Sequence, residues 1–129
     1  MFLLSRLLTA QLTRGPIAYF EDGYDAVFGV VYRPEFEARL RAHFEQNTSG
    51  DIDPAWYALR NTVYASGCRQ FLSKSHSVTF VDAQAQAWRY FENALSVHGE
   101  ILYSSTGLLA VQALAAMVRY ISLAPGELE

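Results

Sequence analysis

Apolar residues recur along most of this chain at intervals of three and four positions, the spacing of an amphipathic α-helix. The first such stretch, at residues 1–15, repeats leucine at helical spacing and predicts an amphipathic N-terminal helix. A second helix is predicted to start at Pro34, because proline is favoured at the first helical position. Its apolar face consists of Phe36, Leu40 and Phe44. The run "FGVVY" at 28–32 has the composition of a strand, but nothing pairs with it and we expect a loop.

Three further helices follow from cap residues and apolar stripes. Asp53 and Pro54 provide an N-cap and a first helical position. The stripe of the helix that they start consists of Trp56, Leu59, Val63, Gly67 and Phe71. A long helix is then expected from about Phe80 to Tyr103, and its stripe consists of Trp88, Phe91, Leu95, His98 and Leu102.

The last predicted helix, closed by Pro125 and Gly126, is apolar on nearly all sides. Only a central position would satisfy such a helix, so we expect it in the middle of the molecule. A chain of 129 residues forms about one domain. The pattern therefore predicts an all-α fold, a compact bundle of five or six helices in a single domain over residues 1–129.

One segment of the sequence occurs twice, the second time in altered form. "AWYALRNTVYASG" at 55–67 is followed by "AWRYFENALSVHG" at 87–99, with Ala, Trp, Asn and Gly in step. Stacked repeats need about three units, and no third copy follows. We therefore expect an echo of local packing rather than a repeat array, with Gly67 and Gly99 allowing neighbouring helices to approach closely.

Composition and charge exclude several classes. A net charge of −3 with scattered basic residues argues against direct contact with nucleic acid. Gln112 and Arg119 interrupt the longest apolar run, so we expect no contact with a membrane. The single cysteine, Cys68, excludes a disulfide framework and fits an intracellular location, in the nucleus or cytoplasm.

Candidate chemistry is sparse. His98 and Glu100 form a candidate catalytic pair, because a buried histidine near a carboxylate could serve as a general base, although a hydrogen-bonded core histidine is the favoured interpretation. The three histidines lack metal-site spacing, and we expect neither metal nor cofactor. The acidic cluster Glu21, Asp22 and Asp25 is typical of a solvated turn.

Aromatic residues with a polar tip are numerous. Four of them, Trp56, Tyr64, Trp88 and Tyr103, are candidate ligand-binding residues that could line a cavity for a small apolar metabolite. Ordinary core filling is the competing interpretation, and the favoured one.

Four motifs in order resemble the fungal-specific transcription factor domain, or middle homology region. They are "AYFEDGYDAVFGVVYRPEFEARL" at 18–40, "DPAWYALRNTVYASGCR" at 53–69, "AQAWRYFENALSV" at 85–97 and "STGLLAVQALAAMVRYISLAPG" at 105–126, where Gln112 matches the family's glutamine. The resemblance covers about residues 17–126. The six-cysteine zinc cluster that usually accompanies this domain is absent, and the chain ends before a further helix typical of the family.

The resemblance implies a regulatory, dimerisation or metabolite-binding module that does not itself bind DNA. The alternative is a small stand-alone enzyme on the same scaffold, such as a cyclase or isomerase of a natural-product pathway. Because the last helix has more apolar surface than one chain covers, we also expect a homodimer.

Overall fold

A computed structural model describes residues 31–46, 53–73, 79–104 and 107–122 of the chain. The helices in these ranges are α3 (Arg33–Gln46), α4 (Pro54–Ser73), α5 (Phe80–Ser96), α6 (His98–Ser104) and α7 (Leu108–Ser122). The described residues contain no strand, and the predicted all-α class is confirmed. The helix expected at 1–15 and most of the loop at 28–32 lie outside the described residues, so the predicted number of helices is not confirmed.

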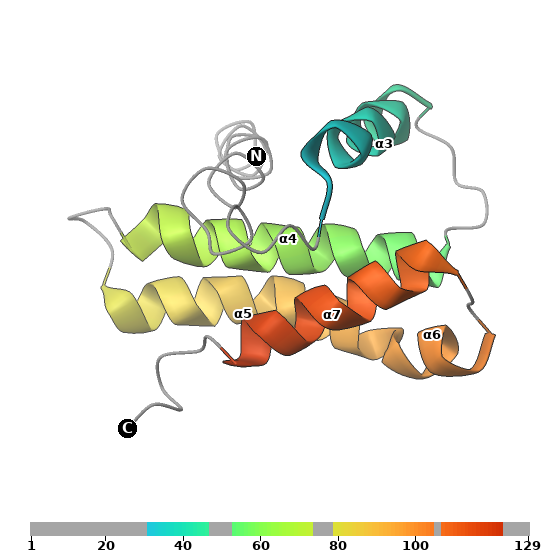
Figure 1. The fold of residues 1–129 in the computed structure, drawn as a ribbon. Coiled ribbons are helices and arrows are strands. Elements are labelled where there is room, and N and C mark those ends of the chain that lie inside the picture. Colours follow the sequence, from blue (N-terminus) through green and yellow to red (C-terminus); the bar gives the residue numbers. More distant parts are fainter. Residues whose placement is uncertain (1–30, 47–52, 74–78, 105–106, 123–129) are drawn as a thin grey trace.

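Helix α4 lies at the centre of the arrangement (Figure 1). It packs along α5, which runs antiparallel to it, and along α7, which runs in its own direction. Helix α3 lies above the first half of α4, where the Phe36 and Trp56 rings meet with their centroids 5.3 Å apart. The expectation that the last helix occupies the centre is therefore wrong.

The side chains of α4 explain why it is central. Its start is fixed as predicted, because the Asp53 carboxylate accepts a hydrogen bond of 2.9 Å from the Ala55 N–H. Small residues on several sides then let neighbouring helices approach closely. Burial extends around most of the circumference, including Ala55, Ala58, Leu59, Thr62, Val63, Ala65 and Cys68. Helix α7 instead buries one face, composed of Ala110, Ala113, Ala116, Met117 and Tyr120.

An aromatic stack joins the three long helices. The rings of Phe91 in α5 and Tyr120 in α7 are nearly parallel, with their centroids 4.6 Å apart. The Trp88 ring lies 5.3 Å from Phe91 and 6.4 Å from Tyr120. The Arg69 guanidinium of α4 covers the Tyr120 ring at 4.2 Å. Phe91 is fully buried, so this stack is part of the main core.

The predicted helix from Phe80 to Tyr103 is interrupted. Thr79 caps α5 by accepting a bond from the Asp82 N–H at 3.1 Å, but the helix ends at Ser96 and Val97 takes a non-helical conformation. Helix α6 then starts at His98 with a new rotational phase, and its buried anchor is Ile101.

This change of phase corrects three expectations. His98 and Leu102 are exposed rather than part of a buried stripe. Gly99 is exposed too, and a Cβ there would meet nothing within 4 Å, so it mediates no close helix approach.

The two similar segments pair with each other. The first lies in α4, and the second covers the end of α5 and the start of α6. Their matching asparagines meet, because the Asn93 side-chain amide donates a 3.1 Å hydrogen bond to the Asn61 side-chain oxygen. Asn61 in turn donates to the Tyr57 carbonyl at 2.9 Å. The two similar segments thus lie on neighbouring antiparallel helices.

We predict that Phe91→Ala lowers the free energy of unfolding by about 3–5 kcal/mol, because it leaves a cavity beneath Tyr120. Urea denaturation followed by circular dichroism would measure the change. Leu102→Ala, at an exposed position of α6, is the control and should change the same quantity by about 0.5 kcal/mol or less. Equal effects of the two substitutions would contradict the described core.

Candidate functional site

Among the described residues, the buried polar and charged side chains all belong to α4 and are Asn61, Thr62 and Arg69. This helix contains two charged residues, Arg60 and Arg69, and no acidic residue. Because α4 itself has no acidic side chain, any negative partner of either arginine must come from another part of the chain. The contacts of the two arginines among the described residues differ. Those of Arg69 indicate a structural role, and those of Arg60 make it a candidate functional residue.

Arg69 has a structural role. Its Nη1 donates a 3.4 Å hydrogen bond to the carbonyl of Tyr120, near the carboxyl end of α7, and its guanidinium lies on the Tyr120 ring. A cation at this position stabilises the exposed carbonyls of a helix end. Burial lowers the pKa of Arg69, and the Tyr120 hydroxyl opposes that shift. Arg69 thereby ties α4 to the end of α7.

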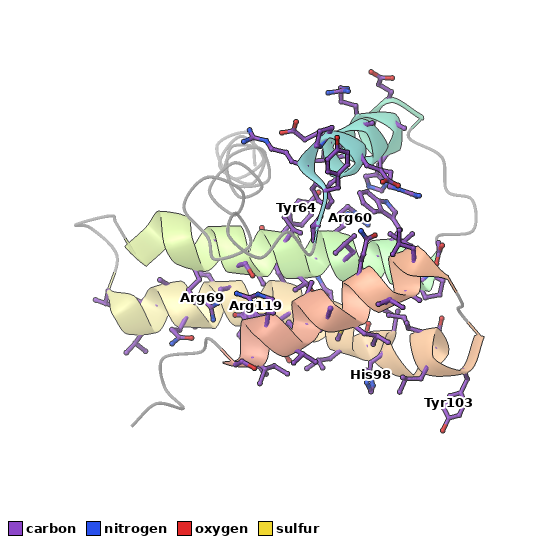
Figure 2. The ribbon with its side chains drawn as sticks, in the orientation of Figure 1. Arg60, Tyr64, Arg69, His98, Tyr103 and Arg119 are labelled. Carbon is purple, nitrogen blue, oxygen red and sulfur yellow. The ribbon has the colours of Figure 1, made fainter. Side chains whose placement is uncertain are left out.

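Arg60 has a different environment (Figure 2). Its guanidinium carbon lies 5.5 Å from the ring centroid of Tyr57 and 5.9 Å from that of Tyr64. Within the described part of the chain, its buried Nε meets no hydrogen-bond acceptor. The guanidinium lies close to the Tyr64 hydroxyl, and its charge and a side-chain hydrogen bond oppose the rise in the Tyr64 pKa that burial causes.

The neighbouring groups set the charge at this position. Burial lowers the pKa of His43 in α3, and the positive charge of Arg60 lowers it further, so both favour the neutral imidazole. Burial raises the pKa of Tyr64, against the opposing influence of Arg60. Arg60 is thus the one positive charge among these described groups. We refer to Arg60, Tyr64, Tyr57 and His43 as the Arg60 cluster.

The four candidate ligand-binding residues are distributed over separate places. Trp56 is buried beneath α3, and Tyr64 is buried against Tyr90, with the ring centroids 5.7 Å apart. Trp88 is 44% exposed at the edge between α5 and α7. Tyr103 is 92% exposed and points away from the bundle (Figure 2). The described residues do not bring them into one cavity.

The candidate catalytic pair is exposed as well. His98 and Glu100 both belong to the short helix α6, and His98 points away from the bundle in Figure 2. Glu100 borders an open depression of about 210 Å³, which it shares with Pro54, Tyr57, Ser96 and Val97. His98 does not line it, so the pair does not form the buried acid–base site that the sequence suggested.

A second surface feature is apolar. Three large side chains of α7, Leu108, Val111 and Val118, are each more than 60% exposed. Together with the partly exposed Ala115 they follow helical spacing along one line, and we call these four residues the α7 seam. No described helix is both long and apolar enough to cross a membrane. The described ranges also hold no group of three histidine, cysteine or acidic residues that could bind a metal ion.

Comparison of the chain with protein-family models, curated proteins and solved structures finds no match. The family resemblance of the sequence motifs therefore stays a prediction, and the site must be interpreted from its own geometry.

Sequence reasoning missed the burial of Arg69 and Asn61, the position of Arg60 between two tyrosine rings, and the hydrogen bond between Asn61 and Asn93. Two signals were present in the sequence. The segment 54–73 has two arginines and no acidic residue, and Asn61 and Asn93 occupy matching positions of the two similar segments. Neither signal shows which residue of another helix contacts the arginines or the asparagines.

Cys68 provides a test of the buried polar environment. Burial raises the pKa of its thiol from 9.0 to about 11. Above about pH 9 the unfolded chain therefore releases this proton while the folded chain retains it, so stability falls as the pH rises. Between pH 8 and pH 11 we expect the wild-type chain to lose about 2 kcal/mol more unfolding free energy than Cys68→Ala. Urea titrations at several pH values would measure this, and parallel pH profiles would contradict it.

Proposed function

We propose that this chain is a helical interaction module that pairs with a second copy of itself along the α7 seam. The observation that carries the proposal is the line of large apolar side chains, at helical spacing, that α7 presents outside the core. Complete burial of one such side chain contributes about 1.5–3 kcal/mol. Three of them are thus a substantial driving force for association.

The geometry of the seam favours a two-fold pair. From Leu108 to Val118 it extends about 15 Å along the helix. Ala115, its smallest member, lies near the middle of α7, so two antiparallel copies can approach closely there. Val111 of one chain then meets Val118 of the other. Such isologous contact is the commonest arrangement in homo-oligomers.

Charge favours a second copy over an unrelated charged partner. The α7 seam contains no charged residue, and Arg119, the one charge in α7, lies beside the seam rather than in it. The uncharged, apolar α7 seam of one chain is therefore complementary to the same seam of a second chain. In Figure 1, α7 lies at the front of the bundle and no other described helix covers it.

The proposed class of function is regulatory. The motifs that resemble the fungal-specific transcription factor domain coincide with the start of α3 and with α4, α5 and α7, and the resemblance implies action through protein contacts. The net charge of −3 supports a module that does not bind DNA directly. The alternative enzyme gains no support from the described residues, because the candidate pair and the candidate aromatic residues do not share a pocket.

We predict that Val118→Glu converts the pair into single chains, because it places a charge in each apolar seam. Light scattering across a tenfold dilution series should give twice the 14.5 kDa chain mass for the wild type and the chain mass for the variant. Val81→Glu is the matched control, since Val81 in α5 is 73% exposed outside the seam. It should remain paired. A wild-type protein of single-chain mass at every concentration would overturn the proposal.

Cross-linking tests the arrangement of the pair. A residue near a two-fold axis faces its own copy, so Ala115→Cys should form a disulfide between chains under mild oxidation. Denaturing electrophoresis without reductant would detect the linked pair. Val81→Cys serves as the control and should stay unlinked. Linkage of both variants to the same extent would indicate random collision and argue against this axis.

A further inference from the structure

We propose that Trp88 of one chain anchors the pair by packing against Leu108 of the other chain. This inference rests on the pairing along the α7 seam proposed above, and it adds a contact from α5 to that pairing. The observation behind it is that Trp88, 44% exposed, lies against the last turn of α7, where its ring centroid is 6.4 Å from that of Tyr120. A large aromatic side chain is thus exposed near the end of the seam at Val118.

The α7 seam by itself is small for a stable pair. Stable protein pairs usually bury about 800 Å² on each partner. The three large side chains of the seam offer roughly 60–120 Å² of apolar surface each, which is less than half of that area in total. The interface must therefore continue beside the seam, on one flank of α7 or on the other.

One flank of α7 is partly covered and polar. Leu109 and Gln112 are half-buried and line a small cavity together with residues of α3 and α4. Arg119 lies seven positions after Gln112, hence on the same flank, and carries a charge. This flank faces α3 and α4 and suits an apolar partner poorly.

The opposite flank is apolar and lies beside α5. It contains Leu114 and Ile121, which are again seven positions apart and of which Ile121 is 40% exposed. Helix α5 adds Trp88 and Leu95, which are exposed and also seven positions apart. We call these four residues the α5–α7 surface. It contains no charged residue, so the seam extends naturally in this direction.

The two-fold relation determines which residue of the second chain meets this surface. An axis that brings Val111 of one chain to Val118 of the other also brings Leu108 to Ile121. The reason is that Leu108 is three positions before Val111, and Ile121 is three positions after Val118. Leu108 is 69% exposed, so it reaches the turn of the other chain against which Trp88 lies.

The surroundings of Trp88 suit it for an anchor. Tryptophan contributes a large apolar area and is enriched among the residues that dominate binding energy at interfaces. The indole is held on its inner side by the rings of Phe91 at 5.3 Å and Tyr120 at 6.4 Å. Because these contacts already restrict its rotamer, little conformational entropy is lost when a leucine packs on the exposed side. The two-fold relation repeats the contact at both ends of the pair.

The test is a double-mutant cycle on the dissociation constant of the pair, measured on the full chain by light scattering across a dilution series. Trp88→Ala and Leu108→Ala should each raise this constant at least about tenfold. The double variant should raise it by less than the product of the two effects, because both substitutions remove the same contact. Within one chain, Leu108 lies about 18 Å along α7 from Tyr120, the neighbour of Trp88, so the coupling arises across the pair.

Val81→Ala is the matched control, since Val81 belongs to α5 but to neither proposed contact surface. It should leave the dissociation constant unchanged within about twofold, and its effect should multiply with that of Leu108→Ala. Circular dichroism of each variant checks that the helices are retained.

Fluorescence gives a second measurement that keeps Trp88 in place. The chain has two tryptophans, so Trp56→Phe leaves Trp88 as the single indole. Its emission should move to shorter wavelength as the concentration rises and the pair forms. Trp88→Phe leaves Trp56, which is covered by α3, and its emission should not change with pairing.

The outcomes separate this inference from the proposal on which it rests. A wild-type chain that stays single at every concentration overturns both. If the wild type pairs, independent effects of Trp88→Ala and Leu108→Ala, or a Trp88 emission that pairing leaves unchanged, overturn the anchor contact alone. Coupling of the two substitutions together with a shift of the Trp88 emission supports it.

Discussion

The structure depends on one constraint, that a helix with two arginines and no acid lies at the centre of the described bundle. Arg69 is buried and Arg60 is half-buried, and a cation in such a position is stabilised by an acceptor or an aromatic face. Arg69 gains both from α7, and this contact couples the end of α4 to the stack of Tyr120 on Phe91. Arg60 instead lies near the rings of Tyr57 and Tyr64 and close to the Tyr64 hydroxyl. The two arginines of α4 are thus stabilised in two different ways.

The sequence predicted those features that local chemistry determines. Asp53 and Pro54 correctly predicted the start of α4. The helical spacing of apolar residues correctly predicted the all-α class. The sequence did not reveal the end of α5 at Ser96, because no glycine or proline stands at Val97. That break follows instead from tertiary packing, with Ile101 anchoring α6 in a new phase.

The candidate site was harder to predict than the fold, for a related reason. Trp56 and Tyr64 were correctly singled out as residues of interest on α4, but polar-tipped aromatics occur in cores and in pockets alike. Which of them meet depends on helix pairing, and α5 leaves Trp88 on an edge while α6 carries Tyr103 into solvent. Hydrophobicity also favoured the last helix as the centre, whereas the small side chains of α4 allow its neighbours to surround it.

The antiparallel pairing of the two similar segments places their matching tryptophans in unlike surroundings. Trp56 is enclosed by Phe36 and His43 of α3, whereas Trp88 is half in solvent beside α7. Because indole fluorescence shifts with solvent exposure, the chain carries two built-in optical reporters at different places. Trp56 reports on the packing of α3 against α4. Trp88 reports on the exposed contact between α5 and α7. In variants that keep one tryptophan each, local opening at either place is distinguishable from loss of the whole fold without any added label.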